Sequence, residues 1–134
     1  MSNAPDRHEL FLIPDGEKKV SMVNDTKFPN VATFTFLRED HTIGNLIRMQ
    51  LLKNPKVLFA GYKIPHPLEH NFVLKIQTTP DTSPLDVLRQ EFRNLETEIN
   101  SIKTKFENEL TLHGMSQTND FGDLRYSSNV DRNF

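Results

Sequence analysis

LDVLRQEFRNLETEINSIKTKF, residues 85–106, decides the fold, because apolar residues recur in it at alternating intervals of three and four. The members of this row are Leu85, Leu88, Phe92, Leu95, Ile99, Ile102 and Phe106, which we call the seam. Such spacing is typical of a helix that packs along a narrow line, as in a coiled coil. No glycine or proline interrupts residues 85–112. The sequence therefore predicts one long amphipathic helix.

The length of this helix bears on what covers the seam. A helix over residues 85–110 is roughly 39 Å long, whereas a globule of 134 residues has a radius of gyration of about 14 Å. Two interpretations stay open: the seam packs wholly on the chain's own sheet, or part of it meets a helix of another chain. The length favours the second, because a small sheet cannot cover seven large side chains over that distance. Charged residues flank the seam at Arg89, Glu91, Glu96, Glu98, Lys103 and Lys105.

Local signals set the ends of the long helix. Ser83 can cap its first turn, with Pro84 at the first helical position, and Gly114 is expected to close it. Residues 115–134 are polar and aperiodic, and they cannot bury enough apolar area to offset the entropy of ordering them. We therefore expect one domain over residues 1–114 and a disordered tail over residues 115–134.

Upstream of the seam, apolar residues alternate at the two-residue period of β-strands. In VATFTFL, residues 31–37, the side chains of Ala32, Phe34 and Phe36 fall on one face and the threonines fall on the other. The candidate strands are residues 18–23, 31–37, 57–64 and 72–78. The sequence thus predicts a sheet of three or four strands beside the long helix.

A shorter helix is predicted within EDHTIGNLIRMQLL, residues 39–52. Its apolar face is formed by Ile43, Leu46, Ile47 and Leu51. Asp40 or Thr42 lies where an N-cap is wanted, and the helix ends before Pro55, because the residue before a proline is disfavoured in helical geometry. Gly44 costs about 1 kcal/mol of helix stability relative to alanine. We therefore expect another backbone or helix to approach closely at Gly44.

Composition argues against several classes of function. The 16 basic and 18 acidic residues give a formal charge of −2 and are spread along the chain, so the concentrated positive field that binds a phosphate backbone is absent. The absence of cysteine excludes a disulfide framework and any cysteine-based zinc or redox site. No apolar run approaches the length that spans a membrane. These features predict a soluble intracellular protein that contacts neither nucleic acid nor membrane directly.

Few residues suggest chemistry. His66 and His70 have a spacing seen among metal ligands, but a proline lies between them and no third ligand is obvious, so neither a metal nor a cofactor is expected. A free-standing enzyme using His41 with Asp40 or Glu39 is an alternative, yet no nucleophile motif accompanies these residues. The two acids are explained by a helix start, where carboxylates complement the helix dipole.

Three motifs together resemble a known family. They are FxxEDHTIGNLIR at residues 36–48, VLFAGYKIPHP at residues 57–67 and LKIQT at residues 74–78. This combination resembles the small alpha-like subunit of eukaryotic and archaeal RNA polymerases, and its helix motif is similar to one in the bacterial alpha subunit. Ile43 stands where leucine is usual. The opening NAPDRHELF, residues 3–11, is similar to the RNA polymerase II branch rather than to the paralogue shared by polymerases I and III. The similarity extends to about residue 112.

The resemblance implies a fold and a role. The implied fold is α+β, an antiparallel sheet of about four strands with one short and one long C-terminal helix packed on one side, as in alpha-subunit dimerisation domains. In that family the helices pair with those of a larger alpha-like subunit, and the heterodimer is an assembly platform for the two catalytic large subunits. The implied function is that of a non-catalytic, nuclear subunit of DNA-directed RNA polymerase II, without a cofactor of its own.

Carried onto this sequence, the resemblance assigns two sets of contact residues. The partner-interface positions, which face the partner or the core, are Ile43, Gly44, Leu46, Ile47, Leu88, Phe92, Leu95, Ile99, Ile102 and Phe106. His41 and Arg48 are expected to face the second-largest polymerase subunit. A homodimeric scaffold with no polymerase role stays an alternative, because the mixed charges beside the seam permit self-pairing.

Overall fold

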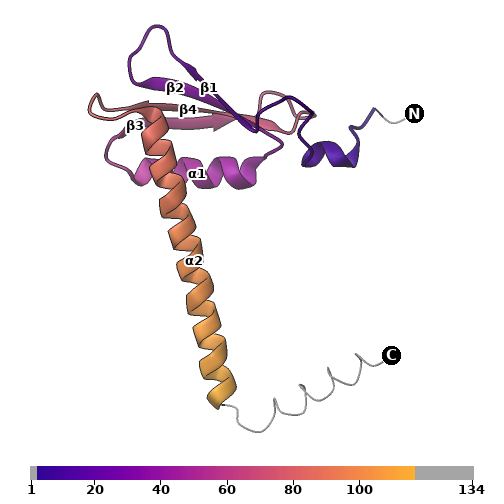
Figure 1. The fold of residues 1–134 in the computed structure, drawn as a ribbon, viewed down its shortest axis with the longest axis vertical. Helices are drawn as coiled ribbons and strands as arrows, with labels where there is room; N and C mark the ends of the chain where they lie inside the picture. Colours follow the sequence, from indigo (N-terminus) through magenta and orange to yellow (C-terminus); the bar gives the residue numbers. More distant parts are fainter. Residues whose placement is uncertain (1–2, 117–134) are drawn as a thin grey trace. The chain divides into compact units, whose positions relative to one another are not determined.

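The computed structural model describes residues 3–116 and contains one antiparallel sheet with α1 and the first turns of α2 on one face (Figure 1). The elements are η1 (Arg7–Leu10), β1 (Val20–Asn24), β2 (Val31–Leu37), α1 (His41–Lys53), β3 (Val57–Lys63), β4 (Asn71–Thr78) and α2 (Pro84–Ser116). The four strands lie in the order β1-β2-β4-β3. The described chain divides into two units between Leu95 and Glu96, and the sheet belongs to the first. The predicted α+β class and antiparallel sheet are confirmed.

The core lies on the helix-covered face of the sheet. Strand β2 pairs with β4 so that Phe36 is opposite Phe72 and Phe34 is opposite Leu74. The rings of Phe36 and Phe72 stack with their centroids 4.6 Å apart. All four side chains are buried, and burial of one such side chain contributes about 1.5–3 kcal/mol. The predicted two-residue alternation therefore places one face of each central strand in the core.

Helix α1 begins where the sequence predicts. Asp40 is its N-cap, and the carboxylate accepts a hydrogen bond of 2.8 Å from the backbone N–H of Thr42. The helix ends at Lys53, just before the predicted breaker. Its buried residues are Gly44, Ile47, Gln50 and Leu51. Leu46, predicted on the same apolar face, is 40% exposed, because the buried line runs through positions 44, 47 and 51 and leaves position 46 beside it.

The close neighbour expected at Gly44 is present, but it is an aromatic side chain rather than a backbone or helix. A Cβ added to Gly44 would lie 2.8 Å from two ring carbons of Tyr62 on β3. That ring is held in place, since its hydroxyl lies 2.7 Å from Nδ1 of His41 and its edge contacts Phe72 with centroids 5.8 Å apart. Glycine at this position therefore lets β3 and α1 pack closely.

Helix α2 starts as predicted and ends later than predicted. The hydroxyl of Ser83 accepts a hydrogen bond of 3.1 Å from the backbone N–H of Asp86, so Ser83 caps the first turn. The helix passes through Gly114 to Ser116, and the prediction that Gly114 closes it is wrong. A closing glycine adopts a positive φ, and Gly114 does not. Residues 117–134 of the expected tail lie outside the described residues, and the domain boundary after residue 114 stays a prediction.

A buried carboxylate joins α1 to the first turns of α2. Glu91, predicted as a flanking charge of the seam, is only 4% exposed. It accepts hydrogen bonds from Nδ2 of Asn54 at 2.6 Å, Nδ2 of Asn94 at 3.1 Å and Nε2 of Gln50 at 3.3 Å. Amide donors on both helices thus satisfy the oxygens of Glu91, as a buried carboxylate requires.

Gly44→Ala is expected to lower the free energy of unfolding by about 1–3 kcal/mol, because the added methyl group overlaps the constrained ring of Tyr62. The matched control is Gly114→Ala, since Gly114 is also helical but has open space where its Cβ would lie. The control should be neutral or stabilise by up to about 1 kcal/mol. Urea titrations of the full chain followed by circular dichroism measure both, and equal effects would contradict the role given to Tyr62.

Candidate partner interface

The first part of the seam belongs to the chain's own core. Leu88 and Leu95 are buried, and Leu85 and Phe92 are partly buried, with Leu85 and Phe92 packed against the core cluster. The ring of Phe92 lies 6.3 Å from that of Phe36, measured between centroids. Up to Leu95, the seam therefore packs on the chain's own sheet. This agrees with the first interpretation for this part of the seam only.

The remainder of the seam is exposed. Its residues, with Leu110 continuing the line, form what we call the distal row: Ile99, Ile102, Phe106 and Leu110, which are 52%, 68%, 64% and 55% exposed. Every side chain described from residue 96 to residue 115 is exposed. In proteins most of the stability of a helix comes from packing of its apolar face, and a contiguous exposed apolar surface is typical of a protein–protein interface. Beyond Leu95, no described residue covers the seam, and the second interpretation, a helix of another chain along it, stays a prediction.

Several positions assigned to the interface are core residues of this chain. Ile47 is fully buried, and the ring of Tyr62 covers Gly44. Leu88 is 4% and Leu95 is 9% exposed. A side chain with almost no accessible surface cannot contact another chain directly. Among the assigned residues of α2, only those of the distal row present a large surface in the described chain.

Helix α1 presents apolar side chains of its own. Leu46, Met49 and Leu52 are 40%, 51% and 50% exposed. Met49 and Leu52 were not predicted, although the three-residue spacing from Leu46 was visible in the sequence. Residues three apart are neighbours on a helix surface, so these side chains form a second apolar strip.

The two residues expected to face the second-largest subunit also lie on α1. His41 is the first residue of the helix and is exposed. Arg48 is partly buried: its Nη2 donates a hydrogen bond of 3.0 Å to Oδ1 of Asn45, and its Nε has no partner among the described residues. His41 and Arg48 are seven residues apart, which corresponds to a rise of about 10 Å along the helix axis.

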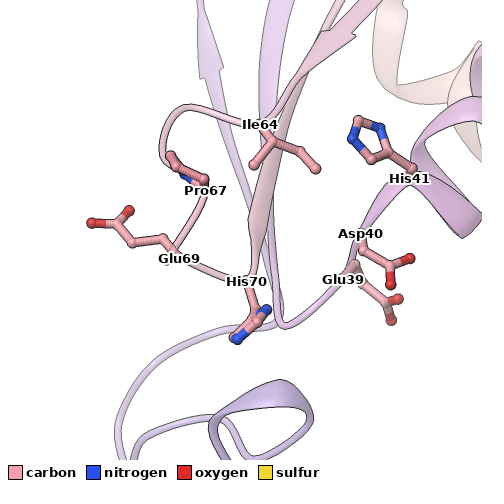
Figure 2. Close-up of a pocket in the computed structure, with 7 residues that line it drawn as sticks. All are labelled: Glu39, Asp40, His41, Ile64, Pro67, Glu69 and His70. Atoms are coloured by element: carbon pink, nitrogen blue, oxygen red, sulfur yellow. The ribbon is translucent and has the colours of Figure 1, made fainter. Parts of the chain in front are cut away.

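A cavity of about 380 Å³ lies beside the start of α1 (Figure 2). It is lined by Glu39, Asp40, His41, Ile64, Pro67, Glu69 and His70. Glu39 is paired with Lys19 at 2.8 Å, Asp40 caps the helix, and the carboxylate of Glu69 points away from both (Figure 2). The side chain and backbone N–H of Thr42 hold the pKa of Asp40 below its ordinary value.

This cavity does not assemble a reactive centre. Asp40 is engaged in a cap and Glu39 in an ion pair, and the carboxylate of Glu69 points away from both, so the three do not converge on one point. Within residues 3–116, no group of three His, Asp or Glu side chains is placed to hold a metal ion. Neither helix of the described chain is long and apolar enough to cross a membrane. The Asp40-His41-Thr42 cluster therefore functions as a helix start.

Comparison with known proteins identifies the family. The model of the "RNA polymerase Rpb3/Rpb11 dimerisation domain" matches residues 31–105, which span β2, α1, β3, β4 and most of α2. The chain belongs to this family. The matched region contains the core and the first two residues of the distal row, Ile99 and Ile102. The resemblance drawn from the sequence motifs is thereby confirmed.

Individual relatives agree with the family match. The chain is 56% identical over 104 residues to the DNA-directed RNA polymerase II subunit rpb11 of Dictyostelium discoideum, covering 78% of this chain and 87% of that protein. It is 45% identical over 114 residues to the RNA polymerase II subunit RPB11 of Schizosaccharomyces pombe, covering 85% and 92%. The solved structure of RNA polymerase subunit L from Thermoplasma acidophilum shares the fold, with a TM-score of 0.60, 22% identity and coverage of 75% and 97%.

Asp40→Ala is expected to lower the free energy of unfolding by about 1 kcal/mol near neutral pH, because the N-cap is lost. The folded-state pKa of Asp40 lies below its ordinary value of 3.8, so the stabilisation is complete above that value and disappears as the pH falls through the lower folded-state pKa. Urea titrations across a pH series should show the difference between the two proteins shrinking below about pH 4. A difference that stays constant in acid would contradict the capping role of the carboxylate.

Proposed function

We propose that this chain is the small alpha-like subunit of RNA polymerase II and forms a heterodimer with the larger alpha-like subunit. The distal row carries the proposal, because it is an apolar surface that the described chain leaves exposed. The family is described as a dimerisation domain. A partner helix along the distal row would bury this surface and stabilise a helix segment that is marginal alone.

The polymerase II assignment is better supported than its alternatives. Relatives that are 45–56% identical to this chain carry the polymerase II name, and the chain covers 85–92% of their lengths. These matches favour neither the paralogue shared by polymerases I and III nor a homodimeric scaffold without a polymerase. We infer that the chain acts in the nucleus, where polymerase II makes mRNA.

The proposed role is structural. The heterodimer serves as the assembly platform for the two catalytic large subunits, and α1 contacts the second-largest subunit through His41 and Arg48. In support of a non-catalytic role, the polar groups around His41 are used within the fold: Asp40 in a cap, Glu39 in an ion pair and His41 beside the hydroxyl of Tyr62.

Ile102→Glu combined with Phe106→Glu is expected to weaken recovery of the larger alpha-like subunit by at least about 30-fold, because two charges would be desolvated in an apolar interface. The fold should persist, since both side chains are more than 60% exposed. Affinity purification of the tagged chain from cell extract followed by mass spectrometry measures the recovery, and circular dichroism checks the fold.

The matched control for this double substitution is Ser101→Glu combined with Thr104→Glu. It adds the same charge to exposed positions on the opposite side of the helix and should leave recovery unchanged. Equal recovery with both double variants would contradict the assigned interface. Recovery of the unmodified chain without any polymerase subunit would overturn the proposed function itself.

Arg48→Ala is expected to leave the heterodimer intact while weakening recovery of the second-largest subunit by about 5–30-fold, the range for loss of one well-placed arginine at an interface. Arg89→Ala, which removes an exposed arginine from α2, is the control and should change neither recovery. Loss of the larger alpha-like subunit together with the second-largest one would show that Arg48 acts on the heterodimer instead.

A further inference from the structure

The distal row is symmetric about Phe106. Together with one following residue it reads Ile99, Ile102, Phe106, Leu110 and His113, with intervals of three, four, four and three. In an α-helix these five positions fall within about 40° of one line along the axis. Leu110 follows Ile99 by eleven positions, which is about three turns, so two such helices can pair along this line with little supercoiling. In an antiparallel pair centred on Phe106, Phe106 meets its counterpart and Ile102 meets Leu110.

The charges beside the row change sign at the same residue. Lys103 and Lys105 precede Phe106, and Glu107 and Glu109 follow it. In an antiparallel pair centred on Phe106, helical geometry places Lys103 of one copy beside Glu107 of the other and Lys105 beside Glu109, each twice. In a parallel, in-register pair, the same geometry places lysine beside lysine and glutamate beside glutamate. Charge therefore favours the antiparallel pair and opposes the parallel one.

We infer that the distal part of α2 is a self-complementary surface on which two copies of this chain pair antiparallel, with Phe106 at the centre. Such a pair uses residues 99–113, all of which are exposed in the described chain. A pair centred nearer Leu95 would instead need side chains that are already in the core. The exposed window and the centre of symmetry thus coincide.

The same charges could also act within one helix, because Lys103 and Glu107, like Lys105 and Glu109, are four residues apart. Lysine preceding glutamate is the weaker orientation for such a pair. None of the four side chains forms an ion pair within residues 3–116. All four remain available to a second copy.

Self-pairing and the proposed heterodimer use the same row and therefore exclude each other. The antiparallel pair joins only a few layers of side chains, which places it among small, transient interfaces. The pair of identical chains has to dissociate before another subunit can cover the distal row, and a weak pair dissociates readily. The inference itself does not depend on which subunit the partner is.

The test is sedimentation velocity of the full chain over a concentration series, with charge-reversal variants. Lys103→Glu with Lys105→Glu makes the flanks wholly acidic, and Glu107→Lys with Glu109→Lys makes them wholly basic. Each variant alone should raise the dissociation constant of the dimer at least about tenfold, because four contacts become repulsive. An equimolar mixture of the two should restore pairing, and so should the chain carrying all four reversals. Restoration in the mixture separates contacts between chains from pairs within one helix.

Disulfide trapping tests the direction, because the chain has no cysteine of its own. A mixture of Ile102→Cys and Leu110→Cys chains should form the mixed disulfide. Ile102→Cys alone should not cross-link, since an antiparallel pair separates the two copies of position 102 by eight residues, about 12 Å, beyond the roughly 7 Å that a disulfide tolerates.

Three results would overturn the inference: a monomer at every concentration, self-association unaffected by either charge reversal, or efficient cross-linking of Ile102→Cys with itself. Any of these results with undiminished recovery of the larger alpha-like subunit leaves the proposed function standing. The reverse combination is also informative. If the chain self-associates as expected but no polymerase subunit is recovered with it, the antiparallel pair is supported and the proposed function is overturned.

Discussion

The apolar seam of α2 is longer than the core that this chain builds to cover it. Seam side chains up to Leu95 are buried or partly buried, whereas those from Ile99 onward are exposed. Burial of each large apolar side chain contributes about 1.5–3 kcal/mol, so the distal row represents several kilocalories of stabilisation that the described chain does not realise. Within residues 3–116, no other side chain covers the distal row. The family to which the chain belongs is described as a dimerisation domain, which agrees with an apolar surface left exposed.

The covered part of the molecule is organised so that two helices share one face of a small sheet. Gly44 allows the ring of Tyr62 to lie against α1, and Glu91 collects amide donors from both helices. The first contact sets how closely α1 approaches β3. The second fixes the first turns of α2 beside α1, because a buried carboxylate tolerates little displacement from its donors. The close packing at Gly44 and the hydrogen bonds to Glu91 together fix how the seam up to Leu95 lies on the sheet.

Features that depend on nearby residues could be predicted from the sequence. The alternation in β2 and β4 and the caps at Asp40 and Ser83 involve residues within a few positions of one another, and the structure confirms them. Features that depend on distant residues were missed. Glu91 and Tyr62 owe their roles to partners from other elements, and Gly114 lies inside α2, which continues to Ser116.

The position along α2 at which the seam changes from buried to exposed could not be predicted from the sequence either. Periodicity identifies which side of a helix is apolar, but every turn of a regular seam looks alike. Where burial stops depends on how far the sheet and α1 extend beneath the helix, which is a property of the assembled core. For the same reason Leu88 and Leu95 were grouped with Ile99 and Phe106, although the two pairs differ in what covers them.

An exposed apolar surface carries a hazard as well as a function, because it can associate with the wrong chain before it meets the right one. The sign change of charge at Phe106 restricts that choice, since like charges oppose a parallel copy while opposite charges accept an antiparallel one. In the proposed scheme, a second copy and a polymerase partner compete for the distal row, and its occupancy follows their relative affinities and concentrations. The contacts expected of His41 and Arg48 involve α1 and none of the distal row. The two proposed contact surfaces therefore share no residue.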